Sequence, residues 1–311
     1  DVVITAVEDG SGIDEDTTTF TLVGSVTGNI VGSGSWSGLV YTFVPTDDLN
    51  ENETYTATMD VDDNAGNHAA QLEFTFQVDV QAPTISALTP ANDTWVTTAT
   101  PAISAKVEDE AGGSGIASST IVMKVDGATV VHAYDSLSGV VSFTPGVALS
   151  EGTHTVTVDV KDVAGNAATQ ASWTFKVDTV APVLNKTSPI GWANVIKPNV
   201  VITAVEATSG IDTTNAASTV FTLSNGGPVA GTGAWDPTGL VYTFVPTGDL
   251  NETSTYTATM DAKDNAGNSA TQLTWTFEVD VQVPTIDNLA PANDTWVTTA
   301  TPAISAQVHS E

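Results

Sequence analysis

The chain has 311 residues, and 37 acidic residues against seven lysines and no arginine give it a formal net charge of −30. This charge argues against nucleic acid and anionic membrane surfaces as partners, because both bind basic protein surfaces. The absence of cysteine excludes disulfides, thiol chemistry and structural zinc sites built on thiolates.

The first element expected is a strand, Asp1-Val2-Val3-Ile4, with no signal-peptide pattern before it. Apolar residues occur only in short runs along the chain, so we expect no membrane-inserted segment. Residues 1–8 match residues 199–206, which form the second strand of a later unit. Residues 1–80 are therefore predicted to form a β-sandwich domain that lacks its first strand.

Residues 81–179 form the complete version of the same unit. Residues 153–160 and 172–177 alternate between apolar and polar side chains, which is typical of half-buried strands. We expect strands near residues 84–88, 102–108, 119–125, 128–133, 139–144, 153–161 and 171–178. About seven short strands with frequent turn signals indicate an immunoglobulin-like β-sandwich.

Residues 180–281 align with this unit throughout, and residues 282–311 repeat only its opening strands. The run Pro90–Ala105 recurs unchanged as Pro291–Ala306, so the period is about one hundred residues, with the closest match about two hundred residues on. The units are joined by short segments such as Val78-Asp79-Val80-Gln81-Ala82-Pro83. Because these linkers are short and lack Gly/Ser tracts, we expect the all-β tandem array to form an extended rod.

Two acidic loops recur in each unit, one after the second strand and one before the last strand. In an immunoglobulin-type sandwich both loops lie at the end where the chain enters, beside the linker aspartate. Calcium takes six to eight oxygen ligands, so the loops and the linkers predict interdomain calcium sites. The candidate ligands are Asp79, Glu108, Asp109, Asp162 and Asn166 at the first junction, and Asp178, Glu206, Asp264 and Asn268 at the second. A tight turn without metal also accounts for Asp-x-Ala-Gly-Asn, since Gly and Asn accept positive φ.

Other polar motifs are weaker. Asn-x-Thr sequons at Asn52, Asn92, Asn185, Asn251 and Asn293 fall in predicted loops and are candidate glycosylation sites. The four histidines have no shared metal-ligand spacing and stand near no nucleophile motif, so they are interpreted as surface residues. No catalytic residue is predicted, and the chain is expected not to be an enzyme.

The linker Val-Asp-x-x-Ala-Pro, the Ser-Gly-Ile loop and the Asp-x-Ala-Gly-Asn turn, in this order, resemble the bacterial Ig-like repeats of large cell-surface adhesins, with similar domains in archaeal surface proteins. The resemblance covers essentially the whole chain. It implies an extracellular stalk or filament at the cell surface, often stiffened by calcium between domains. The expected partners are flanking repeats of the same polypeptide or copies of the chain.

Two accounts of the terminal units remain open. Residues 282–301 carry the opening strand that residues 1–80 lack, so one chain could complete the next by strand addition; residues 303–308 would then be left over. Alternatively, the chain is a window on a longer repetitive polypeptide, which we favour. A glycan- or receptor-binding module and an accessory region of a secreted hydrolase are the alternative functions.

Overall fold

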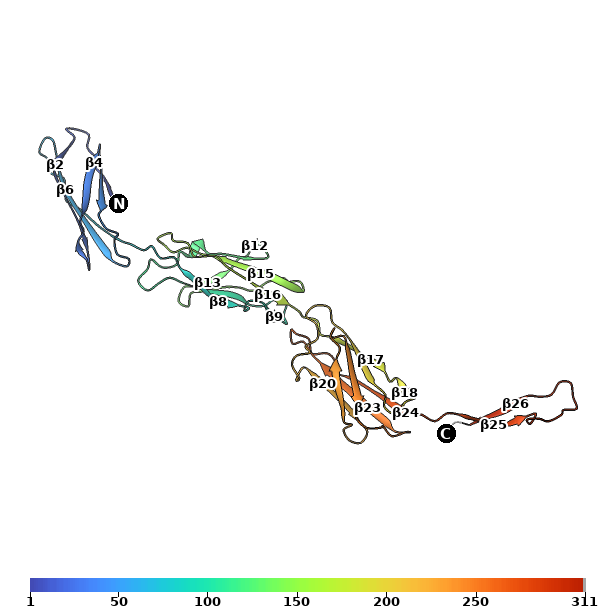
Figure 1. Ribbon diagram of the computed structural model, residues 1–311. Coiled ribbons are helices and arrows are strands. Elements are labelled where there is room, and N and C mark those ends of the chain that lie inside the picture. The colour runs from blue at the N-terminus through green and yellow to red at the C-terminus, as the bar shows by residue number, and fades with distance from the viewer. Residues whose placement is uncertain (310–311) are drawn as a thin grey trace. The chain divides into compact units, whose positions relative to one another are not determined.

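The computed structural model describes residues 1–309, in which every regular element except the short 3-10 turn η1 (Ser118–Thr120) is a β-strand. The strands form tandem two-sheet sandwiches followed by a hairpin (Figure 1). The all-β tandem sandwich predicted from the sequence is therefore confirmed. In residues 1–309 there is no helix with the length and hydropathy needed for a membrane span.

The chain divides into two compact units, and the dividing line runs through the middle sandwich. The first unit comprises Asp1–Asn92, Ala102–Thr144 and Thr155–Thr174, and the second comprises Asp93–Pro101, Pro145–His154 and the chain from Phe175 onward. Residues Asp79, Asp109 and Asp162 thus belong to the first unit, and Asp178, Glu206 and Asp264 to the second.

The N-terminal sandwich consists of strands β1–β7. One sheet has the order β1 (Val2–Thr5), β5 (Val40–Pro45), β4 (Gly32–Ser37), and the other has the order β3 (Gly28–Asn29), β2 (Ile13–Gly24), β6 (Thr54–Asp63), β7 (Leu72–Gln77). Alternate residues of β6 point inward, because side chains along a strand alternate between its faces; these are Tyr55, Ala57 and Met59. Strands β1 and β7 are edge strands.

The middle sandwich consists of β8–β16. One sheet has the order β13 (Ala133–Asp135), β14 (Val140–Phe143), β10 (Ile103–Glu108), β8 (Thr84–Thr89). The other has the order β12 (Ala128–Thr129), β11 (Val122–Val125), β15 (Gly152–Asp159), β16 (Ala171–Val177), β9 (Thr94–Val96). The opening segment thus contributes one strand to each sheet: β8 pairs antiparallel with β10, and β9 pairs parallel with β16.

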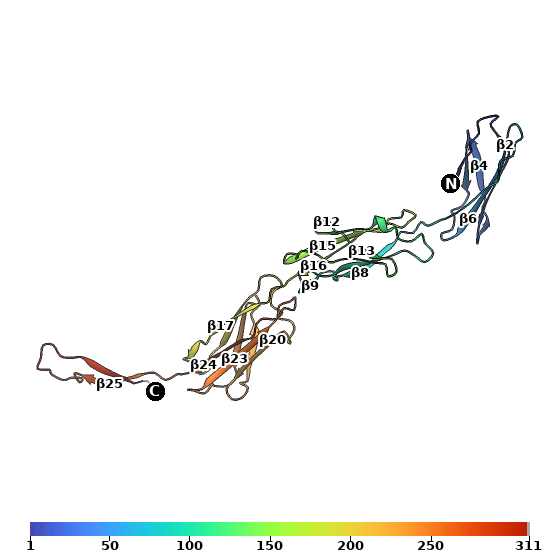
Figure 2. The ribbon, with the colours of Figure 1, turned by 180° about the vertical axis from the view of Figure 1, so that it is seen from behind.

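The third sandwich consists of β17–β24 and has the same plan. Its sheets have the orders β17 (Val183–Ser188), β19 (Val200–Val205), β22 (Val241–Pro246), β21 (Gly231–Trp235), and β18 (Gly191–Ala193), β24 (Leu273–Val279), β23 (Thr255–Ala262), β20 (Thr219–Ser224). Its core is closed by Trp275 and Phe277, which are 4% and 1% exposed. The tail hairpin, β25 (Thr285–Ala290) and β26 (Ser305–His309), is a separate two-stranded sheet, seen from both sides in Figures 1 and 2.

Three details of the middle sandwich differ from the sequence prediction. The strand expected at 119–125 begins only at Val122, because Thr120 Oγ1 donates to the carbonyl of Ala117 at 2.7 Å and closes the turn η1. The strand expected at 128–133 is divided into β12 and β13. Strand β9 was not predicted, since its three residues pair with a strand about eighty positions later in the chain.

Candidate metal centre at the first junction

The two acidic loops lie side by side in each sandwich and are joined by backbone hydrogen bonds. These bonds run from Asn64 N to Gly12 O, Val163 N to Gly115 O and Asn265 N to Gly210 O, at 2.9, 2.8 and 2.9 Å. Each joins the Ser-Gly-Ile loop to the Asp-x-Ala-Gly-Asn turn. The arrangement therefore recurs with the repeat and presents both loops at one end of the sandwich.

The Asp-x-Ala-Gly-Asn turn is closed by its aspartate. In the middle sandwich Asp162 Oδ1 accepts from the amides of Gly165 and Asn166 at 2.6 and 2.7 Å, and Oδ2 accepts from Asn166 Nδ2 at 2.8 Å. Gly165 has φ 105°, a conformation that side chains with a Cβ rarely adopt. The aspartate and the glycine of the motif are thus required by the turn itself, whether or not a metal binds.

The linker aspartate ties this end of the middle sandwich to the preceding chain. Asp79 Oδ2 accepts from Ser114 N at 2.7 Å, Oδ1 accepts from Gln81 N at 3.1 Å, and its carbonyl accepts from Asn166 Nδ2 at 3.1 Å. Hydrogen bonds from Ser114, followed by that from Gln81, lower the pKa of Asp79 because they favour the charged carboxylate. The linker is therefore bonded to both loops of the next sandwich.

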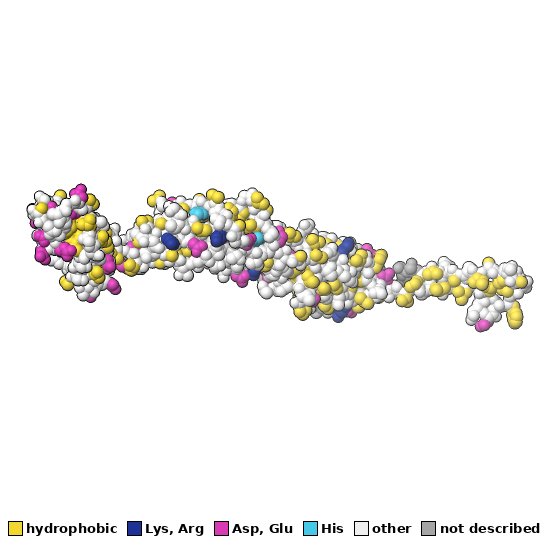
Figure 3. All heavy atoms as spheres, turned by 90° about the horizontal axis from the view of Figure 1, so that it is seen from above, with side chains coloured by type: hydrophobic (Ala, Val, Ile, Leu, Met, Phe, Trp, Pro, Cys, Tyr) yellow, Lys and Arg dark blue, Asp and Glu magenta, His cyan; other side chains and the backbone are white. Residues whose placement is uncertain are grey.

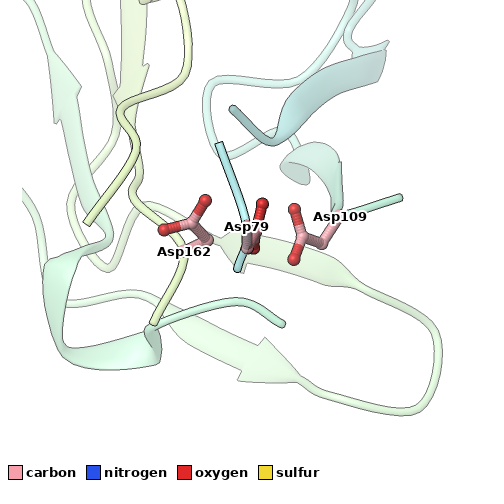
Figure 4. A group of neighbouring side chains, drawn as sticks. All are labelled: Asp79, Asp109 and Asp162. Carbon is pink, nitrogen blue, oxygen red and sulfur yellow. The ribbon is translucent and has the colours of Figure 1, made fainter. Parts of the chain in front are cut away.

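Three carboxylates come together at this junction. Oxygen atoms of Asp79, Asp109 and Asp162 lie within 4.8 Å of one another, and Figure 4 shows Asp79 between the other two. Asp162 is buried, and Asp79 and Asp109 are half-buried. Like charges at this separation repel strongly when partly removed from water, so this group of carboxylates favours the uptake of a cation or a proton.

Glu110 adds a fourth carboxylate that sequence reasoning missed. Both of its carboxylate oxygens, and Oδ1 of Asp109, are buried without a hydrogen-bond partner among residues 1–309. Its own backbone N–H lies near the carboxylate without meeting the geometry of a hydrogen bond and lowers the pKa of Glu110, but burial and the neighbouring Asp109 and Asp79 outweigh this and raise the pKa overall. Buried polar atoms normally have partners, so three unpaired oxygens beside three aspartates leave positions open for a cation.

The other residues predicted for the first junction occupy different roles. Glu108 lies outside the group of carboxylates, is exposed, and forms an ion pair with Lys106. Asn166 lies at the junction, but its amide nitrogen holds Asp79 and Asp162 in place. The structure thus brings together Asp79, Asp109, Asp162 and Asn166, and adds Glu110 where the sequence suggested Glu108.

The second junction has the same framework, but none of its carboxylate oxygens is among the buried unpaired atoms of residues 1–309. Asp178 accepts from the amides of Val180 and Ser209 at 3.0 and 3.2 Å, and its carbonyl accepts from Asn268 Nδ2 at 2.9 Å. Both oxygens of Glu206 accept backbone amides of its own loop. Asp264 accepts from Gly267 N, Asn268 N and Asn268 Nδ2 at 2.7, 2.8 and 2.9 Å.

Loop length explains the difference between the junctions. Glu206 is the structural counterpart of Asp109, and two more residues separate Asp109 from Ser114 than separate Glu206 from Ser209. In the middle sandwich Asp109 bonds the Ser-Gly-Ile loop, as Glu206 does in the third sandwich, and the longer loop leaves Glu110 beside it. The donor set at the first junction fits calcium, which prefers carboxylate and carbonyl oxygens. At the second junction the carboxylate oxygens of Asp178, Glu206 and Asp264 already accept hydrogen bonds.

A second set of contacts fixes each linker to the sandwich before it. Glu51 Oε2 accepts from Gln81 Nε2 at 2.7 Å, Glu151 Oε1 accepts from Thr179 Oγ1 at 2.5 Å, and Glu252 Oε2 accepts from Gln282 Nε2 at 3.1 Å. Sequence reasoning missed these glutamates, although their recurrence just before β6, β15 and β23 is visible in the repeat. The first two linkers, residues 78–83 and 177–182, are thus hydrogen-bonded on both sides.

The five sequon asparagines are exposed. Four lie outside strands, but Asn185 lies within β17 rather than in the predicted loop. Asn92 Oδ1 accepts from Thr174 N at 3.0 Å.

Among the histidines, His154 is not a surface residue: it is 4% exposed, and its Nε2 lies 2.8 Å from the carbonyl of Ser150. This position is occupied by Tyr55 and Tyr256 in the other two sandwiches, which explains its burial.

Comparison with known proteins agrees with this architecture. Residues 81–179 match one family model described as a bacterial Ig-like domain, and residues 10–78 and 178–279 match a second model with the same description. The chain therefore belongs to the bacterial Ig-like domains. A search of curated proteins finds no match.

Solved structures with similar folds include fibronectin(III)-like modules of Clostridium thermocellum CbhA. They share 14% identity, with 63% of this chain and 94% of that chain covered and a TM-score of 0.35. Immunoglobulin domains 1–5 of Sidekick-1 share 10% identity, with 88% of this chain and 56% of that chain covered and a TM-score of 0.39.

Proposed function

We propose that the chain is a non-enzymatic structural segment of an extracellular surface filament or adhesin stalk, and that calcium fixes its first junction. Tandem bacterial Ig-like domains with short linkers are suited to spanning distance and carrying load. The observation that carries the calcium proposal is the convergence of Asp79, Asp109 and Asp162 with the unpaired oxygens of Glu110. These residues come from the linker and from two loops of the next sandwich.

A cation at this position would hold the linker to both loops by bonds stronger than the present amide contacts. Asp79 already accepts hydrogen bonds from Ser114 and Gln81, so its carboxylate is oriented before any ligand arrives. On the other side of the linker, Glu51 holds Gln81. Calcium would therefore restrict bending at the first junction more than at the second, where no such set of unpaired oxygens exists among residues 1–309.

The experiment is calcium titration of the whole chain by isothermal titration calorimetry, with three proteins compared. The wild-type chain is expected to bind calcium. Asp109→Asn combined with Glu110→Gln should weaken binding by about tenfold or more, because calcium affinity follows ligand charge. Glu108→Gln is the matched control: it removes an adjacent carboxylate that lies outside the group of carboxylates, and binding should not change.

Hydrogen exchange of residues 78–83 with and without calcium then reports the mechanical consequence. The proposal is supported if calcium slows amide exchange in residues 78–83 more than in residues 177–182. No calcium binding by the wild-type chain would refute the metal site, and equal binding by the double variant would place it elsewhere.

The five sequon asparagines are proposed as glycosylation sites of the same extracellular segment. The intact mass of the native protein before and after deglycosylation would test this proposal.

A further inference from the structure

The third sandwich has a hollow of about 500 Å³ beside the strand β21. Strand β21 is an edge of one sheet and β20 is an edge of the other, and residues of both strands line the hollow together with the loops next to them. Trp235 also lines a second hollow of about 370 Å³ that includes Thr243 and Val245 of β22. Hollows of this size that combine aromatic and polar side chains are typical of small-molecule sites.

The aromatic wall of the larger hollow is held in place within the sandwich. Trp235 Nε1 donates to Thr219 Oγ1 at 2.9 Å, and the indole packs edge-on to the ring of Tyr242 with 5.4 Å between the centroids. In the N-terminal sandwich Trp36 Nε1 donates to Thr18 Oγ1 at the same distance. The position of the tryptophan ring is therefore part of the fold and needs no ligand.

Two longer loop segments distinguish the third sandwich at this place. Residues 211–221 are three residues longer than their counterpart in the N-terminal sandwich, residues 13–20. Residues 235–242 are two residues longer than residues 36–41. The lining residues that these two segments supply beside the tryptophan and the tyrosine include Asn215, Ala216, Asp236 and Pro237. The hollow is thus built around a shared aromatic pair by loops particular to the third sandwich.

The hydroxyl of Tyr242 is a buried polar group at this hollow. Tyr242 is 7% exposed, and its hydroxyl lies against Gly233, another lining residue. Burial raises the pKa of Tyr242, and its hydroxyl has no hydrogen-bond partner among residues 1–309. The hydroxyl of Tyr256 in the same sandwich, in contrast, accepts from Asn251 N at 2.7 Å. Because buried polar groups normally have a partner, the Tyr242 hydroxyl marks a position for a ligand.

Asn215 supplies a second polar group. Its Oδ1 accepts from Ala217 N at 3.0 Å, while its Nδ2 has no acceptor in the part of the chain that the structure describes. Asp212 fixes the same loop, since its Oδ1 accepts from Asn215 N at 3.1 Å and its Oδ2 accepts from Ser218 Oγ at 2.6 Å. The amide of Asn215 is therefore held at the hollow by its own loop and can donate to a ligand.

The charges at the hollow argue for a neutral ligand. Asp236 is the one charged residue among the described residues that line it, and the chain has a net charge of −30, so an anion would be repelled. Figure 3 shows acidic side chains on the surface of each sandwich. The Asp236 carboxylate already accepts from Thr238 Oγ1 and Leu240 N at 2.7 and 3.0 Å. A cation would therefore compete with these contacts.

We propose that the hollow at Trp235 binds a neutral sugar unit of a glycan. The C–H face of a sugar ring is apolar and suits an aromatic wall, whereas its hydroxyls need donors and acceptors. Trp235 provides the apolar wall, the Tyr242 hydroxyl donates to or accepts from a sugar hydroxyl, and Asn215 Nδ2 donates to another. The inference goes beyond the structural role proposed above and is independent of the calcium site.

Saturation-transfer difference NMR of the whole chain tests the inference. The neutral probes are maltohexaose, cellohexaose, mannohexaose and chitohexaose, and sialyllactose is the anionic probe. At least one neutral probe should bind at millimolar concentration, and sialyllactose should not. Tyr242→Phe and Asn215→Ala should each weaken binding of that probe by about fivefold, the usual effect of losing one hydrogen bond.

Tyr41→Phe is the matched control. Tyr41 is also 7% exposed, and its hydroxyl lies against Gly34 as that of Tyr242 lies against Gly233, but the longer loops are missing there. Binding should be unchanged in Tyr41→Phe, and thermal unfolding should change little in either tyrosine variant. Failure of all four neutral probes to bind would overturn the inference. Preference for sialyllactose, or equal weakening by Tyr41→Phe and Tyr242→Phe, would also overturn it.

Discussion

The turn aspartate of the third sandwich offers a quantitative test of how the junctions are stabilised. Asp264 is 1% exposed and accepts hydrogen bonds from Gly267 N, Asn268 N and Asn268 Nδ2. Asn268 in turn donates to the carbonyl of the linker residue Asp178 at 2.9 Å. Replacing Asp264 by alanine therefore removes the acceptor for three donors and loosens a contact with the linker.

The expected loss follows from these contacts. A net contribution of about 1 kcal/mol per hydrogen bond gives a destabilisation of about 3 kcal/mol for Asp264→Ala. In the N-terminal sandwich Asp63 also accepts three hydrogen bonds, from Ala65 N in place of the glycine amide and from Asn67 N and Asn67 Nδ2, but it is less buried than Asp264. Water can replace the lost acceptor there, so Asp63→Ala should destabilise its own sandwich by less than half as much.

Hydrogen exchange with mass spectrometry measures both effects in the whole chain, because peptides report each sandwich separately. Protected amides of β23 and β24 should exchange about a hundredfold faster in Asp264→Ala, the factor that corresponds to about 3 kcal/mol. Asp264→Asn, which keeps one oxygen acceptor, should recover part of the loss. Equal effects of Asp63→Ala and Asp264→Ala on their own sandwiches would refute the argument that burial by the linker gives Asp264 its larger role.

Three further outcomes are expected. The hydroxyl of Thr27, followed by the Thr27 and Val26 amides, lowers the pKa of Glu53 to about 2. The stability that this group contributes is therefore present above its unfolded pKa near 4.5 and is lost as the pH falls towards 2. Glu53→Gln should flatten the acid dependence of urea unfolding in the N-terminal sandwich. An unchanged acid dependence would contradict this assignment. Glu51→Ala should speed amide exchange at Val80 and Gln81 without changing exchange in β6, whereas slower or equal exchange would show that Glu51 does not hold the linker. Gly233→Ala should lower the free energy of unfolding of the third sandwich by about 1–3 kcal/mol, because a Cβ would meet the Tyr242 hydroxyl; Gly248→Ala, where the space is open, is the control in thermal unfolding.

The first two linkers are hydrogen-bonded on both sides. In the first two linkers the strand end is bonded backward through Glu51 or Glu151 and forward through Asp79 or Asp178. These contacts use backbone amides and a few polar side chains.

Much of the architecture followed from local sequence. Alternating side chains in β15 and β16, and the repeat of about one hundred residues, indicated tandem sandwiches because strand periodicity and turn residues are local properties. The Asp-x-Ala-Gly-Asn turn was equally visible, since its glycine at positive φ and its aspartate acceptor lie within five residues.

Only the tertiary structure decided which carboxylates meet. Two more residues in one loop place Asp109 and Glu110 beside Asp79 and turn Glu108 towards Lys106, and no local pattern distinguishes these three acids. Strand β9 escaped prediction for a similar reason, because its partner lies about eighty residues away. The burial that leaves the oxygens of Glu110 unpaired arises from the packing of the linker and loops against one another, which depends on contacts distant in sequence.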